Sequence, residues 1–323
     1  MSPLTRFRTA LGFGAQVAAT AAPEPYRRPG GPEHQALLAE INADVPPDVD
    51  WTAGALDYVA AEIRKHGYDG YTHYLLTKPF GPINLGEAGQ ADWAENVHYL
   101  YNFVNLFHFL NLPGGSVVLD VACGSGWVSQ FFARMGYVAH GFDLCPDMVE
   151  LTRRRLREDA QLATLHPLLE QSFFPLDIEK QELPAPLHGT VGAVVLESCL
   201  HHFVDPVTAL SHLADGLSPD GLMLVIEGEN RQGPLNPHYL DVMQNFDTLE
   251  RPYTRSQMTR MLHLAGLPHH CFLGRLNGWF TPDDPALAHV AQRVHTDADA
   301  LNLVVCARTP EALRRVVPHY TPA

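Results

Sequence analysis

Positive charge is what this sequence lacks most. Its 323 residues include 22 lysines and arginines against 36 aspartates and glutamates, which gives a formal net charge of −14 with histidine neutral. Proteins that bind nucleic acid or anionic membranes neutralise phosphates with basic side chains, so this balance disfavours both kinds of partner. The one local cluster of arginines, at 153–157, is interpreted as the solvated face of a helix.

Cysteines are also few, and long apolar runs are absent. The five cysteines form no Cys-x-x-Cys pair, and no histidine stands at zinc-ligand spacing; this is typical of reduced thiols in a cytoplasmic protein. No apolar stretch reaches the roughly 18–20 residues of a membrane-spanning helix. The first 23 residues faintly resemble a signal peptide, but glycines and polar residues interrupt their apolar part, so we expect a tail there.

What the sequence has is enough apolar side chain for a large core, since 46% of its residues are hydrophobic. From residue 116 onward, continuous apolar runs alternate with helical patterns, which is typical of a parallel sheet covered by helices on both faces. The fold class is therefore α/β. Strands are predicted at 117–121, 138–143, 172–177, 191–197, 222–227 and 301–307, and helices at 127–135, 146–157, 206–217, 256–265 and 285–294.

The first 111 residues have a different character. Residues 23–50 are rich in proline and glycine and are predicted to be irregular apart from one short helical pattern at 37–41. A helix is predicted at 55–66. A second, at 92–108, carries apolar residues on two sides, as a helix buried between two layers does. We therefore expect an irregular tail at 1–54, a helical cap or lid at 55–111, an α/β domain at 112–309 and a C-terminal tail at 310–323.

A glycine-rich turn, Leu119-Asp-Val-Ala-Cys-Gly-Ser-Gly-Trp127, joins the first predicted strand to its helix. Glycines let the backbone approach a ligand closely, and the following helix N-terminus presents free N–H groups. Asp120, just before the turn, is unfavourable beside a pyrophosphate but suits an amino group. Ser129 stands where the dinucleotide fingerprint has its third glycine. Asp143, which ends the second strand, is the expected acceptor for a ribose diol, whether the ligand is a dinucleotide or another molecule that contains a ribose.

These features and four further segments, in order along the chain, resemble the class I S-adenosylmethionine-dependent methyltransferases. The resemblance covers roughly residues 112–308 and is carried by 118–126, 143–148, 174–178, 194–203 and 209–222. It implies a Rossmann-like seven-stranded sheet whose last strand runs antiparallel, preceded by the helical cap. It also implies S-adenosylmethionine as the cofactor, whose sulfonium and amine cations suit carboxylates at the strand ends.

The resemblance assigns cofactor contacts residue by residue. Asp143 would bind the ribose, Met148 would pack against the adenine and Asp177 would accept from the adenine amino group. The full implied set is Asp120, Ala122, Cys123, Gly124, Ser125, Gly126, Asp143, Leu144, Met148, Asp177, Ile178 and Glu197.

Two histidines directly follow the fourth predicted strand, at the sheet edge where the methyl group would emerge. Methyl transfer is an in-line displacement at an activated carbon, so the enzyme mainly positions the reactants and removes a proton when the acceptor is a hydroxyl. His202, and after it His201, is the candidate base; alternatively, the pair only shapes the loop. A magnesium ion between Glu197, Glu229 and Asn230 is the less favoured variant, and no metal is expected.

Aromatic residues concentrate in the cap, where 11 of the chain's 30 fall between positions 58 and 109. The predicted acceptor residues lie there and in the segment after the fifth strand: Tyr71, Tyr74, Trp93, Arg231 and Tyr239.

The predicted function is methyl transfer to a small molecule, preferably to a hydroxyl oxygen of a sugar or natural product. The alternatives are C- or N-methylation of a small molecule, methylation of a protein and, more remotely, an NAD-dependent oxidoreductase or a non-catalytic cofactor-binding module. The oligomeric state is left open.

Overall fold

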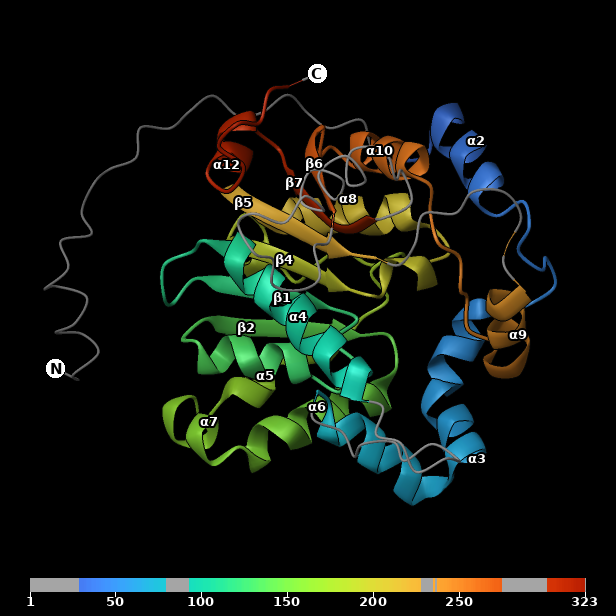
Figure 1. The fold of residues 1–323 in the computed structure, drawn as a ribbon, viewed down its shortest axis with the longest axis vertical. Coiled ribbons are helices and arrows are strands. Elements are labelled where there is room, and N and C mark those ends of the chain that lie inside the picture. Colours follow the sequence, from blue (N-terminus) through green and yellow to red (C-terminus); the bar gives the residue numbers. More distant parts are fainter. Residues whose placement is uncertain (1–28, 80–92, 228–234, 236, 275–300, 323) are drawn as a thin grey trace, which may run out of the picture.

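The computed structural model describes residues 29–79, 93–227, 235, 237–274 and 301–322. A seven-stranded sheet in the order β3-β2-β1-β4-β5-β7-β6 forms the centre of the molecule (Figure 1). Its strands are β1 Val117–Val121, β2 Val138–Asp143, β3 Phe173–Pro175, β4 Val191–Glu197, β5 Leu217–Ile226, β6 His269–Gly274 and β7 Leu301–Ala307. The predicted α/β class and seven-stranded sheet are confirmed.

The strand directions decide where a site can form. Strands β3, β2, β1, β4 and β5 pair in parallel, so their carboxyl ends meet at one edge of the sheet. Strand β7 inserts between β5 and β6 and runs antiparallel to both, as the resemblance implied. Val304 and Cys306 of β7 are completely buried, which explains why this strand is a continuous apolar run.

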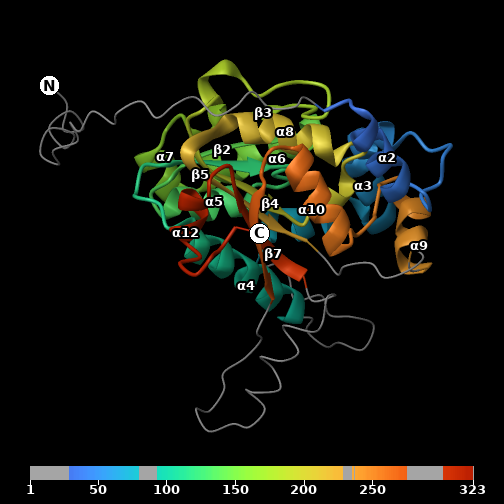
Figure 2. The same cartoon turned by 90° about the horizontal axis from the view of Figure 1, so that it is seen from above.

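Helices cover both faces of the sheet (Figure 2). On one face, α2, α8 and α10 contribute to the larger apolar core; on the other, α4, α5 and α12 contribute to a second one. The helices are α2 Pro32–Ile41, α3 Trp51–Thr77, α4 Trp93–Leu110, α5 Trp127–Arg134, α6 Pro146–Glu158, α7 Ala160–Leu165, α8 Pro206–Gly216, α9 Pro237–Phe246, α10 Arg255–Leu264 and α12 Pro310–Arg314. Short 3-10 turns are η1 Leu169–Ser172, η2 Ala185–Leu187 and η3 Leu200–His202.

Helix α3 differs most from its prediction, because it has 27 residues and begins four residues earlier than expected. Asp50 caps it by accepting a hydrogen bond from the Ala53 amide at 3.0 Å. Helix α2 forms within the proline-rich stretch, where Leu37 and Ile41 of the short helical pattern are buried against the main core. The packing of that apolar face, with Pro32 in the first turn, explains a helix among proline and glycine residues.

Helix α4 is not buried on two sides as expected. Its Phe103, Leu106 and Leu110 pack on the sheet, whereas Val104 is 61% exposed. Of the second apolar stripe, the described side chains are Leu100, which is half-buried, and Val104. The predicted helix at 285–294 lies outside the described residues, and α9 was not predicted. Among the described residues, no helix combines the length and apolarity that crossing a membrane requires.

Candidate active site

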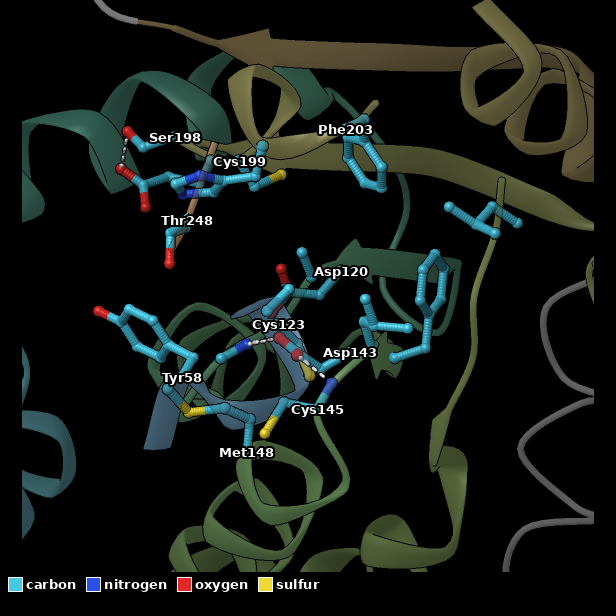
Figure 3. Close-up of a pocket in the computed structure, with 18 of the residues that line it drawn as sticks. Tyr58, Asp120, Cys123, Asp143, Cys145, Met148, Ser198, Cys199, Phe203 and Thr248 are labelled. Carbon is cyan, nitrogen blue, oxygen red and sulfur yellow. Dashed lines mark hydrogen bonds between the residues drawn. The ribbon is translucent and has the colours of Figure 1, made fainter. Parts of the chain in front are cut away.

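A cavity of about 410 Å³ opens at the edge of the sheet where β1, β2 and β4 end (Figure 3). Three carboxylates at or near these strand ends line it: Asp120, Asp143 and Glu197. Helix α3 supplies part of another wall, including Trp51 and Tyr58, and Figure 3 shows Tyr58 next to Met148 of α6. The cavity is thus enclosed by both the sheet edge and the N-terminal helix.

The glycine-rich turn has the conformation that its sequence predicts. Gly124 and Gly126 have φ angles of +53° and +73°. A Cβ atom at Gly126 would lie 2.5 Å from Cγ2 of Thr152, while one at Gly124 would meet nothing within 4 Å. Gly126 is therefore required by packing behind the turn, and Gly124 leaves space on the side that faces the cavity. Within the described residues, the buried Ser125 hydroxyl has no hydrogen-bond partner.

Asp120 is nearly buried and accepts a hydrogen bond from the Ser129 hydroxyl at 2.5 Å. Ser129 occupies the position of the missing third glycine, so its side chain holds this carboxylate in place. The pKa of Asp120 is raised to about 7: burial raises it most, the Ser129 hydrogen bond lowers it, and the neighbouring carboxylates of Glu197 and Asp143 raise it again. A cation that approaches this carboxylate would favour its ionised form.

Asp143 spans the turn, since its carboxylate accepts from the Gly124 and Cys145 amides, both at 2.9 Å. Burial nevertheless raises the pKa of Asp143 to about 6. Next to it, Met148 and Cys145 pack against Val59 of α3 and form an apolar shelf. A buried carboxylate beside an apolar shelf matches a ribose and the base attached to it.

The other predicted cofactor residues lie in the same cavity, with one exception. Asp177 accepts from Lys180 Nζ at 2.8 Å and also lines the cavity. Gly126 does not line it but shapes the turn behind it. The remaining lining residues of the predicted set are Ala122, Cys123, Gly124, Ser125, Leu144, Met148, Ile178 and Glu197.

Both predicted catalytic histidines line the cavity, with ring centroids 4.0 Å apart. His201 Nδ1 lies 2.6 Å from Glu227 Oε2. Burial alone would lower the pKa of His201, but the carboxylates of Glu227 and Glu250 raise it to about 9. Burial and the adjacent charge of His201 lower the pKa of His202 to about 3. At neutral pH the first ring is therefore protonated and the second is neutral.

The hydrogen bonds of His202 also define its tautomer. Its Nδ1 atom lies 2.7 Å from the carbonyl oxygen of Leu249. A carbonyl only accepts hydrogen bonds, so Nδ1 carries the proton and the lone pair is on Nε2. His202 therefore has the tautomer of a proton acceptor, and its pKa of about 3 makes it a weaker base than a free imidazole.

Sequence reasoning missed several lining or supporting residues. Glu227 is buried and accepts from the Leu200 amide at 2.6 Å as well as binding His201; its position directly after the fifth strand was a usable signal. Glu250, Thr248 and Tyr58 line the cavity but come from distant segments without a motif. These positions depend on long-range packing.

For most of the predicted acceptor residues, the structure does not describe the side chain. Tyr71 and Tyr74 lie on α3 and Trp93 begins α4, but their side chains are outside what the structure describes, as is the whole of Arg231. Tyr239, on α9, packs at the edge of a separate apolar cluster with Trp51 and is not among the residues that line the cavity.

The interpretation of the arginine cluster at 153–157 as a solvated helix face is wrong for Arg155, which is buried. It is 8% exposed and donates to the carbonyl oxygens of Leu75 at 2.6 Å and Lys78 at 2.7 Å. These are the last turn and the C-cap of α3, so a buried guanidinium ties the N-terminal helix to α6. The helical pattern of 146–157 did not show that its inner side faces another helix.

An α/β sheet of this order, with a glycine-rich turn and carboxylates around a cavity at its strand ends, defines a class I methyltransferase fold. Residues 87–270, more than half of the chain, match the family described as methyltransferase domain. The chain belongs to this family.

Relatives support the same class. Over 116 residues, 35% of this chain, the sequence is 32% identical to the ubiquinone biosynthesis O-methyltransferase of Xanthomonas axonopodis pv. citri (strain 306), and the match spans 43% of that protein. Phosphoethanolamine N-methyltransferase 2 of Haemonchus contortus, solved with S-adenosyl-L-methionine, is similar over 78% of this chain and 60% of its own, with a TM-score of 0.52 and 15% identity.

A third similar protein is the geranyl diphosphate C-methyltransferase of Streptomyces coelicolor A3(2). It covers 87% of this chain and 99% of its own, with a TM-score of 0.50 and 14% identity. The two solved structures are distant in sequence and show the fold alone. The family match and the 32% identical relative confirm the predicted class, an S-adenosylmethionine-dependent methyltransferase.

Proposed function

We propose that this protein transfers the methyl group of S-adenosylmethionine to a hydroxyl oxygen of a small molecule that binds in the cavity. The observation that carries the proposal is that the cofactor-type carboxylates of Asp120 and Asp143 and the histidine pair line one cavity. When bound, the cofactor supplies a sulfonium-activated methyl carbon.

The residues fit this cofactor in charge and in polarity. Asp143 is held by two amides and keeps lone pairs for the ribose hydroxyls. Asp120 faces the same cavity and suits a cationic amine. The buried Ser125 hydroxyl, which has no partner among the described residues, fits a polar group of the ligand. Asp177 and Met148 are proposed to contact the adenine.

We propose that the proton of the acceptor hydroxyl passes to His202 Nε2 when no metal ion is bound. His202 is neutral and its Nδ1 proton is held by the Leu249 carbonyl. His201 is the weaker candidate, since the carboxylate of Glu227 keeps it protonated at neutral pH. The protein then binds both reactants, orients them and accepts one proton.

A small acceptor is favoured by the cavity itself. Its volume of about 410 Å³ lies within the range of roughly 300–1,000 Å³ that small-molecule sites have. Oxygen as the methylated atom is supported by the Xanthomonas relative, which is an O-methyltransferase. That relative matches over less than half of its length, so the acceptor itself is proposed only as a hydroxylated small molecule.

The test is methyl transfer from isotope-labelled cofactor into pools of phenols, sugars and other hydroxylated metabolites, followed by mass spectrometry of the product. We expect labelled methyl ethers and stoichiometric S-adenosylhomocysteine. Asp143→Asn serves as the cofactor-site control and should abolish the signal at low cofactor concentration. Transfer only to protein, or saturation by NAD and not by S-adenosylmethionine in calorimetry, would contradict the proposal.

A further inference from the structure

Two imidazoles and a carboxylate meet at the wall of the cavity. One ring nitrogen each of His201 and His202 and one carboxylate oxygen of Glu250 all lie within 4.8 Å of one another. Glu250 Oε2 is 3.4 Å from His201 Nε2. That distance is longer than a charged hydrogen bond of about 2.7–2.9 Å. It matches two ligands of one cation, since bonds of about 2.1 Å at tetrahedral or octahedral angles put ligand atoms roughly 3.0–3.4 Å apart.

The hydrogen-bond partners of both imidazole rings are of the kind that metal-binding histidines have. His201 Nδ1 is 2.6 Å from the buried carboxylate of Glu227, and His202 Nδ1 is 2.7 Å from the Leu249 carbonyl. Histidines that bind metals almost always donate their other N–H to a carboxylate or a backbone carbonyl, which sets the tautomer. In His201, Nε2 is then the nitrogen left to bind a cation. In His202, Nδ1 lies 2.7 Å from the Leu249 carbonyl oxygen and 3.7 Å from Glu250 Oε1, so Nε2 is likewise the nitrogen that keeps a lone pair.

The charge of this group also calls for a cation. Glu227 and Glu250 bring two negative charges to the group, and both side chains are at most 21% exposed. A divalent cation at the same place would compensate both.

We propose that His201, His202 and Glu250 bind one divalent transition-metal cation at the wall of the cavity, with Glu227 as the residue that orients His201. Two imidazoles and one carboxylate suit zinc, manganese or iron(II) better than magnesium, which prefers oxygen ligands. Three protein ligands leave coordination positions open toward the cavity. The site differs from the acid-based one considered from the sequence, whose Glu197 accepts from Asn102 at 3.0 Å.

For its chemical consequence this inference rests on the proposed function. The hydroxyl oxygen of the acceptor would occupy an open position, and the cation would lower the pKa of that hydroxyl. The proton leaves to water, the oxygen forms a bond to the methyl carbon, and the carbon–sulfur bond breaks with its electron pair remaining on sulfur. With the cation bound, His202 acts as a ligand and no longer as the proton acceptor.

The test is titration of the full, chelator-treated chain with Zn²⁺ in a calorimeter and with Co²⁺ in an absorption spectrometer. We expect one ion per chain. Glu250→Gln should weaken binding by at least ten-fold, and Glu227→Gln by about 10–100-fold. The matched control is His263→Gln, which removes an exposed imidazole on α10 next to His270; its affinity should equal that of the unmodified chain.

Several outcomes would overturn the site: no ion bound, equal affinity in Glu250→Gln, or equal loss in His263→Gln. Calorimetry with S-adenosylmethionine checks that Glu250→Gln is folded. Failure of the two proposals is distinguishable. Full methyl transfer in EDTA overturns the catalytic consequence and leaves the proposed function standing. One ion bound as predicted, with no transfer to any hydroxylated acceptor, supports the metal site and contradicts the proposed function.

Discussion

Acidification should weaken cofactor binding more steeply than ordinary carboxylates would allow. Burial raises the pKa of Asp143 to about 6 and that of Asp120 to about 7. In the proposed site, Asp143 and Asp120 bind the ribose hydroxyls and the amine of the cofactor in their ionised forms. Each acid therefore supports binding above its folded-state pKa and stops supporting it as the pH falls below that value.

The size of the effect follows from the ionised fractions. Between pH 7.5 and pH 5 the ionised fraction of Asp143 falls about 11-fold, and that of Asp120 falls about 80-fold. If the two act independently, the dissociation constant rises about 800-fold over this range. The histidine pair does not contribute there, since His201 stays protonated and His202 stays neutral.

The assay is calorimetric titration with S-adenosylmethionine at half-unit steps of pH, with circular dichroism to verify the fold at each. Asp143→Asn should bind more weakly at pH 7.5 and lose about ten-fold of the pH dependence. Repeating the titrations in buffers of different ionisation enthalpy should show proton release near pH 6.5. A dissociation constant that changes less than three-fold between pH 5 and pH 7.5 would refute the reasoning.

Three further outcomes are expected. Gly126→Ala should lower the free energy of unfolding by about 2–4 kcal/mol, because its Cβ would clash with Thr152 at a positive φ. Gly124→Ala should lower it by only about 1–2 kcal/mol, because a Cβ there meets open space. Equal losses of the two variants in urea titrations would contradict this. Arg155→Met should leave the sheet folded but make α3 sensitive to limited proteolysis and weaken cofactor binding; an unchanged cleavage pattern would argue against the buried tie. His202→Gln should reduce kcat at least 100-fold with cofactor affinity retained, whereas a near-unchanged kcat would leave the histidine a role in loop shape alone.

Much of the sheet, and the set of residues that gathers around the cavity, could be predicted because the signals are local. Strands β1, β2, β4 and β7 begin and end where the apolar runs do. Carboxyl ends of parallel strands meet at one edge, so acids placed at those ends by sequence gather around one cavity. Eleven of the twelve predicted cofactor residues line it, the exception being Gly126.

Long-range packing explains what could not be predicted. Arg155 has the same helical position as a solvated arginine, and only the carbonyls of α3, about 80 residues away in sequence, make it a buried tie. Tyr239 carried an acceptor-type side chain, yet the helix on which it lies directs it toward the cluster of Trp51. Val104 of α4 shows the converse, since it continues an apolar pattern and is nevertheless 61% exposed.

The sequence by itself determined the positions of most strands of the α/β unit, the glycine-rich turn and the acids at the strand ends, because each depends on neighbours within one element or one connection. Only the tertiary structure decided that α3 encloses the cavity and that Glu227, Glu250 and the Leu249 carbonyl surround the histidine pair. Those contacts join the histidines to residues 26 to 49 positions further along the chain. Glu227 follows β5, and Leu249 and Glu250 lie in the segment before α10. Charge and tautomer at the histidines follow from these contacts, so the chemistry of the pair is a property of the folded chain.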